Sequence, residues 1–235
     1  MKKSPAFLLY LLAAVVYLIS IVANIDFLTL IAKPIISSSI LFYYCQECNF
    51  KINKWNVLML FLLICSGILN LFEDSFALKY VILINMTVYS ILVGLIIQKL
   101  ISKKLKKLDA INLSYILLTF FLLAIFLYMC LVLIFDKTDT LYIYIMIYCC
   151  VLTILGVLST VLYISNSIKA NIFLLTTTFC YVICDTFYVI YYYYYDFIFF
   201  RMTSIIAYVI SFYFLVNYFL YTNEMQKINV KEDVT

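Results

Sequence analysis

Long apolar runs fill almost the whole of this 235-residue sequence. A helix needs about 20 apolar residues to cross a membrane. Apolar residues make up 67% of the chain and charged residues only 12%, so little is left for a soluble domain. Charged or turn residues separate eight such runs, at 6–24, 28–44, 55–72, 79–98, 110–135, 140–164, 171–192 and 198–221. Runs such as Ile116 to Phe135 are apolar on every face, unlike the alternating strands of membrane barrels. We therefore predict an all-α polytopic membrane protein, a bundle of eight transmembrane helices in one domain that covers 1–235.

The positions of Lys and Arg predict the orientation of these helices, because cytoplasmic loops retain basic residues. If the amino terminus is cytoplasmic, only Lys79, Lys137 and Arg201 fall on the outer side, and Lys33 lies within a span. All other basic residues fall on the cytoplasmic side. This split predicts that both termini are cytoplasmic. The first run also resembles a signal peptide, but its length and the missing small-residue cleavage pattern favour a retained helix.

Three ionisable residues lie within or at the ends of the predicted spans, where their insertion costs free energy. They are Lys33 in the second helix, Asp74 at the end of the third and Asp185 in the seventh. The topology places all three in the outer half of the membrane, with Asn85 and Asn24 in the same layer. We expect a polar cavity that opens outward between the second, third, fourth and seventh helices. Two alternatives remain: a structural ion pair of Lys33 with Asp185, and a solvated surface acid at Asp74.

Other residue types exclude several kinds of chemistry. The chain has no His, which excludes His-ligated zinc, a Ser-His-Asp triad and haem with a His ligand. Cys45 and Cys48 form a CxxC motif, but no second pair has matching spacing, so we expect no metal site. The tyrosines of 191–195 are typical of an aromatic belt at the membrane surface. The lysine cluster at 99–107 is typical of a cytoplasmic anchor, and binding of anionic headgroups is the alternative.

Four short motifs occur in an order that is similar to a known family. They are Ala32-Lys33-Pro34, the acid at Glu73-Asp74, Cys184-Asp185-Thr186, and Tyr208 in the last helix. The motifs and the predicted number of helices resemble those of the YhhN family of eight-helix membrane proteins, which includes the lysoplasmalogenases. The resemblance covers nearly the whole chain. Three features differ from the family pattern. The family prefers small residues around both acids, whereas Phe72 and Glu73 are larger. The family usually has a His in or near the fourth helix, and it tends to have a basic residue where this chain has tyrosines at 191–193.

The resemblance implies hydrolysis of the vinyl ether bond of lysoplasmalogens to a fatty aldehyde and a glycerophospho headgroup. Two carboxyl groups suffice for this reaction, one as general acid and one that stabilises the cation and orients water. We expect Asp185 to be the acid and Asp74 the ionised partner. Lys33, Asn85 and Tyr208 are the expected substrate-binding residues, with Lys33 either meeting the phosphate or orienting an acid. No metal or organic cofactor is required.

The expected partners are a lysophospholipid or other lipid and the bilayer itself, with no nucleic acid. Short loops and the family resemblance favour a bacterial inner (cytoplasmic) membrane. Two other functions remain open at this stage. One is a non-catalytic relative that binds lipid, and the other is a small proton-coupled transporter that uses Lys33 and Asp185.

Overall fold

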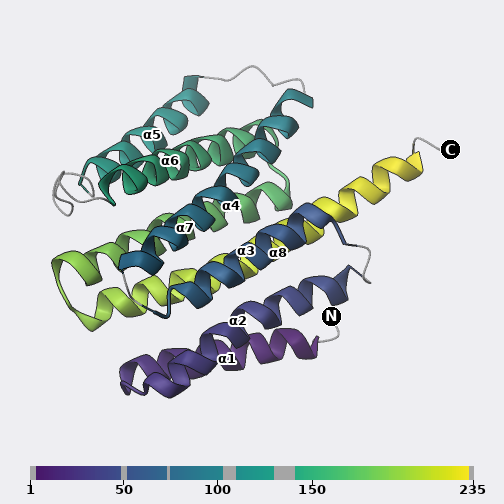
Figure 1. Cartoon of the computed structure of the whole chain (residues 1–235). Helices are drawn as coiled ribbons and strands as arrows, with labels where there is room; N and C mark the ends of the chain where they lie inside the picture. The colour runs from purple at the N-terminus through teal and green to yellow at the C-terminus, as the bar shows by residue number, and fades with distance from the viewer. Residues whose placement is uncertain (1–3, 49–51, 73–74, 103–109, 130–140, 233–235) are drawn as a thin grey trace.

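The computed structural model describes residues 4–48, 52–72, 75–102, 110–129 and 141–232, and the secondary structure in these ranges is entirely helical (Figure 1). Its elements are α1 (Pro5–Val22), α2 (Asp26–Glu47), α3 (Lys54–Leu69), α4 (Ser75–Ser102), α5 (Ala110–Met129), α6 (Tyr142–Ser165), α7 (Lys169–Val189), the π-helical turn η2 (Ile190–Tyr194) and α8 (Ile198–Glu232). The predicted all-α class is confirmed.

Six of these helices are long and apolar enough to cross a membrane, and they belong to α1, α2, α4, α6, α7 with η2, and α8. The helix α3 and the apolar part of α5 are shorter than the usual span. Large apolar side chains such as Leu8, Leu12 and Ile19 of α1 point outward, where lipid chains rather than water can cover them. The chain is therefore an integral membrane protein, whereas the number of eight spans and the cytoplasmic position of the termini stay predictions.

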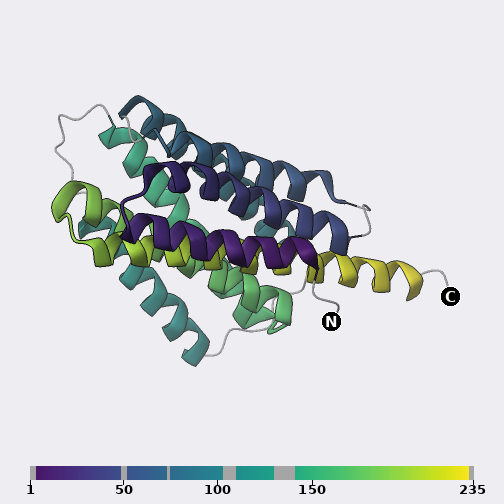
Figure 2. The same cartoon turned by 90° about the horizontal axis from the view of Figure 1, so that it is seen from below.

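The helices form one bundle in which α7 and α8 pack against each other along most of their length (Figure 1). The pair α1 and α2 lies on one side of α8, and Figure 2 shows α1 passing along α8. On the other side α6 packs against α4, α5 and α7, while α3 joins α2 to α4. The beginning of α1 and the end of α8 lie at the same end of the bundle (Figure 1).

Local sequence explains where several helices begin and end. Asn24 adopts a positive φ of 53° in the turn between α1 and α2, a conformation that Asn tolerates better than most residues. Asn24 thus serves the turn and does not line the cavity described below. The helix α8 continues beyond the predicted 198–221 because no helix-breaking residue follows its apolar part.

Small residues allow close contact between helices. A Cβ atom on Gly156 of α6 would lie 2.5 Å from Cδ1 of Leu123 on α5, so only Gly permits the present position of Leu123. Gly67 of α3 likewise faces α8, because a Cβ atom there would lie 2.8 Å from the hydroxyl of Tyr208. Small residues where helices meet are typical of membrane proteins.

Candidate functional site

A cavity of about 470 Å³ lies inside the bundle, near the end where α1 meets α2 and α7 meets α8. The helices α2, α3, α4, α6, α7 and α8 line it, together with η2 and one residue of α1. The prediction of a polar cavity among the second, third, fourth and seventh helices agrees with this arrangement. The lining is mixed, and its charged or amide-bearing side chains are those of Asp26, Lys33, Asn70, Asn85, Asp185 and Arg201.

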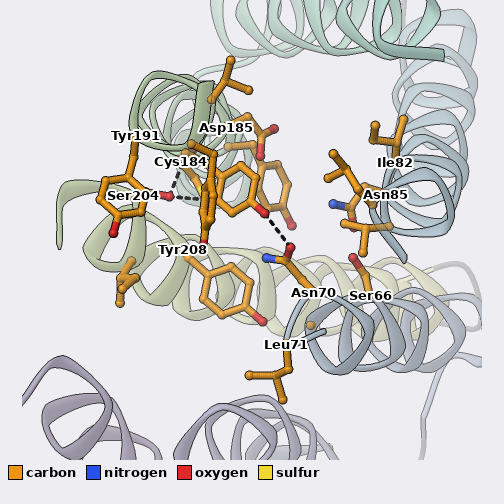
Figure 3. Close-up of a pocket in the computed structure, with 18 of the residues that line it drawn as sticks. Ser66, Asn70, Leu71, Ile82, Asn85, Cys184, Asp185, Tyr191, Ser204 and Tyr208 are labelled. Carbon is orange, nitrogen blue, oxygen red and sulfur yellow. Dashed lines mark hydrogen bonds between the residues drawn. The ribbon is translucent and has the colours of Figure 1, made fainter. Parts of the chain in front are cut away.

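Four of the five predicted site residues line this cavity although they come from four different helices. They are Lys33 of α2, Asn85 of α4, Asp185 of α7 and Tyr208 of α8. Figure 3 shows Asn85, Asp185 and Tyr208 around a shared space, with Asn70, the residue after α3, beside them. The fifth, Asp74, lies outside the described residues. The structure thus brings the four together, and their chemical roles stay predictions.

Asp185 is held by a tyrosine that sequence analysis did not single out. The hydroxyl of Tyr148 on α6 donates a hydrogen bond to Oδ2 of Asp185 at 2.5 Å. The same hydroxyl lies 3.3 Å from that of Tyr89 on α4, and the Tyr89 ring packs against Tyr181 with its centroid 4.8 Å away. All three tyrosines are buried and line the cavity. The Tyr148 hydroxyl therefore holds the carboxyl, and Tyr89 and Tyr181 support Tyr148 through the 3.3 Å hydroxyl contact and ring packing.

Lys33 is buried, with 7% of its surface exposed. Its backbone carbonyl is linked through Ser37 to Tyr208 of α8. The hydroxyl of Ser37 donates to the Lys33 carbonyl at 3.4 Å and lies 3.2 Å from the hydroxyl of Tyr208. Pro34, inside α2, lacks the N–H that would otherwise bond the carbonyl of Leu30, another residue of the cavity wall. The printed contact that holds the Asp185 carboxyl is the hydrogen bond from Tyr148 on α6. The structural ion pair of Lys33 with Asp185 stays an alternative.

Two polar atoms of the cavity wall have no hydrogen-bond partner in the described part of the chain. They are Oδ1 of Asn85 and the hydroxyl of Tyr181, and Tyr181 is only 4% exposed. A buried polar group without a partner costs about 1–3 kcal/mol. Both atoms belong to residues that line the cavity, so a molecule with its own donor and acceptor groups would satisfy them there.

The π-helical turn η2 brings tyrosines to the edge of the cavity. Tyr191 and Tyr192 pack perpendicular to each other, with ring centroids 4.9 Å apart, and both line the cavity. Nη1 of Arg201, in the first turn of α8, donates to the Tyr191 hydroxyl at 3.4 Å. The hydroxyl of Tyr188 donates to Oδ1 of Asn70 at 2.9 Å (Figure 3). The predicted aromatic belt therefore also forms part of the cavity wall.

Sequence reasoning missed Tyr148, Tyr89 and Arg201 for understandable reasons. The chain contains 23 tyrosines, and nothing local distinguishes two of them within apolar runs. Arg201 was counted only as a basic residue near a loop. The sequence does contain a signal for Arg201. This residue lies among apolar residues at the start of a span, where a charge costs free energy.

Together, the fold and the cavity define a helical integral membrane protein with a mixed polar and apolar site near one end of its bundle. No family model, curated protein or solved structure matches this chain. Membership of the YhhN family therefore stays a prediction from the sequence motifs.

Proposed function

We propose that this protein is a lysoplasmalogenase-like hydrolase that cleaves the vinyl ether bond of a single-chain lipid. The observation that carries the proposal is the place of Asp185, a carboxyl held by Tyr148 on the wall of a cavity that also contains Lys33, Asn85 and Tyr208. Vinyl ether hydrolysis needs an acid within a largely apolar site, and the residues of this cavity wall provide both. Membership of the YhhN family, inferred from the motifs, is part of the same proposal.

In this mechanism Asp185 supplies the proton. Tyr148 donates to Oδ2, and in this proposal Oδ1 carries the proton toward the substrate. Transfer of that proton to the β-carbon of the vinyl ether produces an oxocarbenium ion and an ionised Asp185. Water then adds to the cation, its extra proton returns to a carboxylate, and the resulting hemiacetal breaks down to a fatty aldehyde and an alcohol on the glycerophospho headgroup.

The remaining site residues bind and orient the lipid. Apolar side chains of the wall, among them Leu63, Ile82 and Leu152, would contact the alkenyl chain. Asn85 and Tyr208 would bond the polar part of the lipid, and Lys33 would meet its phosphate or orient an acid. Asp74 is the proposed second carboxylate, which stabilises the cation and orients the water. The reaction as written requires neither a metal nor an organic cofactor.

The proposed setting is a bacterial inner membrane that the chain crosses eight times with both termini in the cytoplasm. In this orientation the end of the bundle where α1 meets α2 and α7 meets α8 lies on the outer side. The lipid would then enter from the outer leaflet, and the headgroup product would leave on that side. The bilayer and its lipids are the proposed partners.

The test uses the full chain purified in detergent and incubated separately with a lysoplasmalogen and with the matching acyl-ester lysophospholipid. Mass spectrometry follows the release of aldehyde and of fatty acid. We expect aldehyde from the vinyl ether alone, and we expect Asp185→Asn to abolish it. Glu47→Gln, at the opposite end of α2 and exposed, is the matched control and should retain activity. Aldehyde release that survives Asp185→Asn would show that Asp185 is not the acid.

Two alternative functions have distinct outcomes in related assays. A non-catalytic lipid-binding protein, favoured by the missing His, would retain the lipid and release no product. A proton-coupled transporter would move a labelled solute into proteoliposomes in response to a proton gradient. Proteoliposomes that show such flux and no hydrolysis would replace the hydrolase by the transporter.

A further inference from the structure

Large buried side chains close the inner end of the cavity. On each helix that lines it, one lining residue lies farthest from the bundle end where α1 meets α2. On five helices this innermost side chain is large and no more than 5% exposed, so the cavity ends there. We call these five side chains the floor. They are Leu63 of α3, Tyr89 of α4, Leu152 of α6, Tyr181 of α7 and Phe212 of α8.

A layer of polar side chains lies one helical turn from the floor. We call it the polar layer, and it consists of Asn85 of α4, Tyr148 of α6, Asp185 of α7 and Tyr208 of α8. Each of the four is separated by four residues from the floor residue of its own helix. Figure 3 shows Asn85, Asp185 and Tyr208 around one space. The proposed acid therefore lies near the closed end of the cavity.

The short distance between Asp185 and the floor limits which part of a ligand can lie there. The four residues from Tyr181 to Asp185 span roughly 6 Å at about 1.5 Å per residue. A long alkyl chain exceeds this length, and so does a glycerol extended by a phosphocholine group. Two carbon–carbon bonds of about 1.5 Å join the ends of a glycerol, which therefore fits.

Two polar atoms near the floor have hydrogen-bonding capacity that the described part of the chain does not use. They are Oδ1 of Asn85 in the polar layer and the hydroxyl of Tyr181 in the floor. An amide oxygen only accepts hydrogen bonds, so its ligand must be a donor. A phosphodiester and a quaternary ammonium group have no hydrogen to donate, whereas each hydroxyl of a diol can both donate and accept. A diol therefore suits both atoms.

We propose that the polar layer and the floor bind the free diol of a single-chain glycerol ether lipid that has no phosphate. Its chain points away from the floor, where Ile82, Ile145 and Ile205 line the cavity one turn beyond the polar layer. The inference rests on the proposed function for the single chain and the vinyl ether, and it identifies glycerol as the polar group that fits best. Hydrolysis of such a lipid consumes one water and gives a fatty aldehyde and free glycerol.

The test measures binding of two saturated ethers that the proposed reaction cannot cleave. One is an alkylglycerol, and the other is the lysophosphocholine with the same alkyl chain. We expect the full-length protein in detergent to bind the alkylglycerol more tightly by roughly tenfold or more, the contribution of two hydrogen bonds. An alkylglycerol with a longer chain should bind no more weakly, because the end of the chain does not reach the floor.

Variants of the two unpartnered groups test the contact with the diol. Tyr181→Phe removes a hydroxyl that has no partner in the described part of the chain, so folding should be unaffected. It should weaken the alkylglycerol by roughly twofold to tenfold and the phosphorylated lipid by less than about twofold. Asn85→Leu should have the same effect. Tyr163→Phe on α6, outside the cavity wall, is the matched control and should change neither affinity.

Variants of the floor test the limit on length. Leu63→Ala and Leu152→Ala each remove part of the floor from a different helix and deepen the cavity beyond the polar layer. The phosphorylated lipid should then gain affinity relative to the alkylglycerol. If one of these variants does not fold, the other provides the same comparison.

Several outcomes would overturn the inference. They are equal or tighter binding of the phosphorylated lipid by the unaltered protein, weaker binding of the longer chain, and unchanged alkylglycerol affinity in both Tyr181→Phe and Asn85→Leu. Free glycerol that displaces the alkylglycerol at equal concentration would assign the floor to a soluble polyol, whereas its failure supports the lipid. Neither probe contains a vinyl ether, so a failure of the proposed hydrolysis leaves this result unaffected.

Discussion

At the scale of single residues, the hydroxyl of Tyr148 is the contact that positions Asp185. Tyr148→Phe removes this hydroxyl and little else. A hydrogen bond to a charged group contributes about 1.5–3 kcal/mol, so vinyl ether hydrolysis should fall by roughly tenfold or more. We expect the loss in kcat rather than in KM, because Tyr148 contacts the acid. Tyr163→Phe, on the same helix but outside the cavity wall, is the control. Unchanged kcat in Tyr148→Phe would show that the contact has no part in catalysis.

The same scale shows which site residues a sequence can identify. Lys33, Asn85 and Asp185 are conspicuous because polar side chains within apolar runs are costly and therefore need a reason. Tyr148 could not be found this way, because a tyrosine is tolerated within a membrane and its partner Asp185 comes from another helix. Only the packing of α6 against α7 and α4 brings the two together. Long-range contacts of this kind leave no local pattern.

At the scale of helices, Gly67 of α3 leaves room for the Tyr208 side chain that reaches it from α8. In Gly67→Ala the new Cβ would lie 2.8 Å from the Tyr208 hydroxyl, so that hydroxyl must move away from Ser37. Crowding of this kind costs roughly 1–3 kcal/mol of stability. Thermal unfolding in detergent should show the loss, together with weaker lipid binding. The double variant Gly67→Ala with Tyr208→Phe removes the crowding atom and should regain stability.

Gly94 of α4 provides the matched control for this prediction. A Cβ atom there would have no neighbour within 4 Å, so Gly94→Ala should leave stability unchanged or raise it by up to about 1 kcal/mol through helix propensity. Equal destabilisation by both substitutions would contradict the assigned role of Gly67. A general intolerance of alanine in these helices would then explain both losses.

The existence of the helices was more predictable than their ends. Apolar runs identified the eight α-helices of the described ranges, because length and hydrophobicity are local properties. The third helix ends at Leu69 rather than at 72, where turn-type hydrogen bonds from Leu71 and Phe72 follow. The seventh passes into the turn η2, which no periodicity in the tyrosine run indicates. Helix ends depend on such local backbone bonds, which the hydropathy pattern does not contain.

At the scale of the whole molecule, the two ends of the bundle differ. Away from the cavity, Tyr44 of α2 accepts hydrogen bonds from Asn56 of α3 and Asn223 of α8, each at 3.0 Å. At the same end Lys99 of α4 donates to the hydroxyl of Tyr218 on α8, also at 3.0 Å. These bonds join α2 and α4 to α8, and α3 to α2. Hydrogen bonds thus connect the helices at one end of the bundle, and the cavity lies near the other end. This arrangement is consistent with a site that a ligand enters from one side.

The short helix α3 is one of the two helices on which the prediction of eight crossings depends, the other being α5 with its short apolar part. The 16 residues of α3 span roughly 24 Å at about 1.5 Å per residue, against a hydrocarbon core of about 30 Å. Local thinning of the bilayer accommodates such a mismatch at modest cost. Because α3 packs between α2 and α4 within the bundle, we predict that it crosses.

Cysteine labelling tests this crossing in bacterial spheroplasts, with the eight native Cys replaced. Phe72, which is 70% exposed, and Lys54, also exposed, lie near opposite ends of α3. An impermeant maleimide should label Phe72→Cys in intact spheroplasts and Lys54→Cys only after permeabilisation. Ile25→Cys, in the turn between α1 and α2, should behave as Phe72→Cys does, because both lie at the cavity end. Labelling of Phe72→Cys and Lys54→Cys from one side would mean that α3 does not cross, and the eight-span topology would then be wrong.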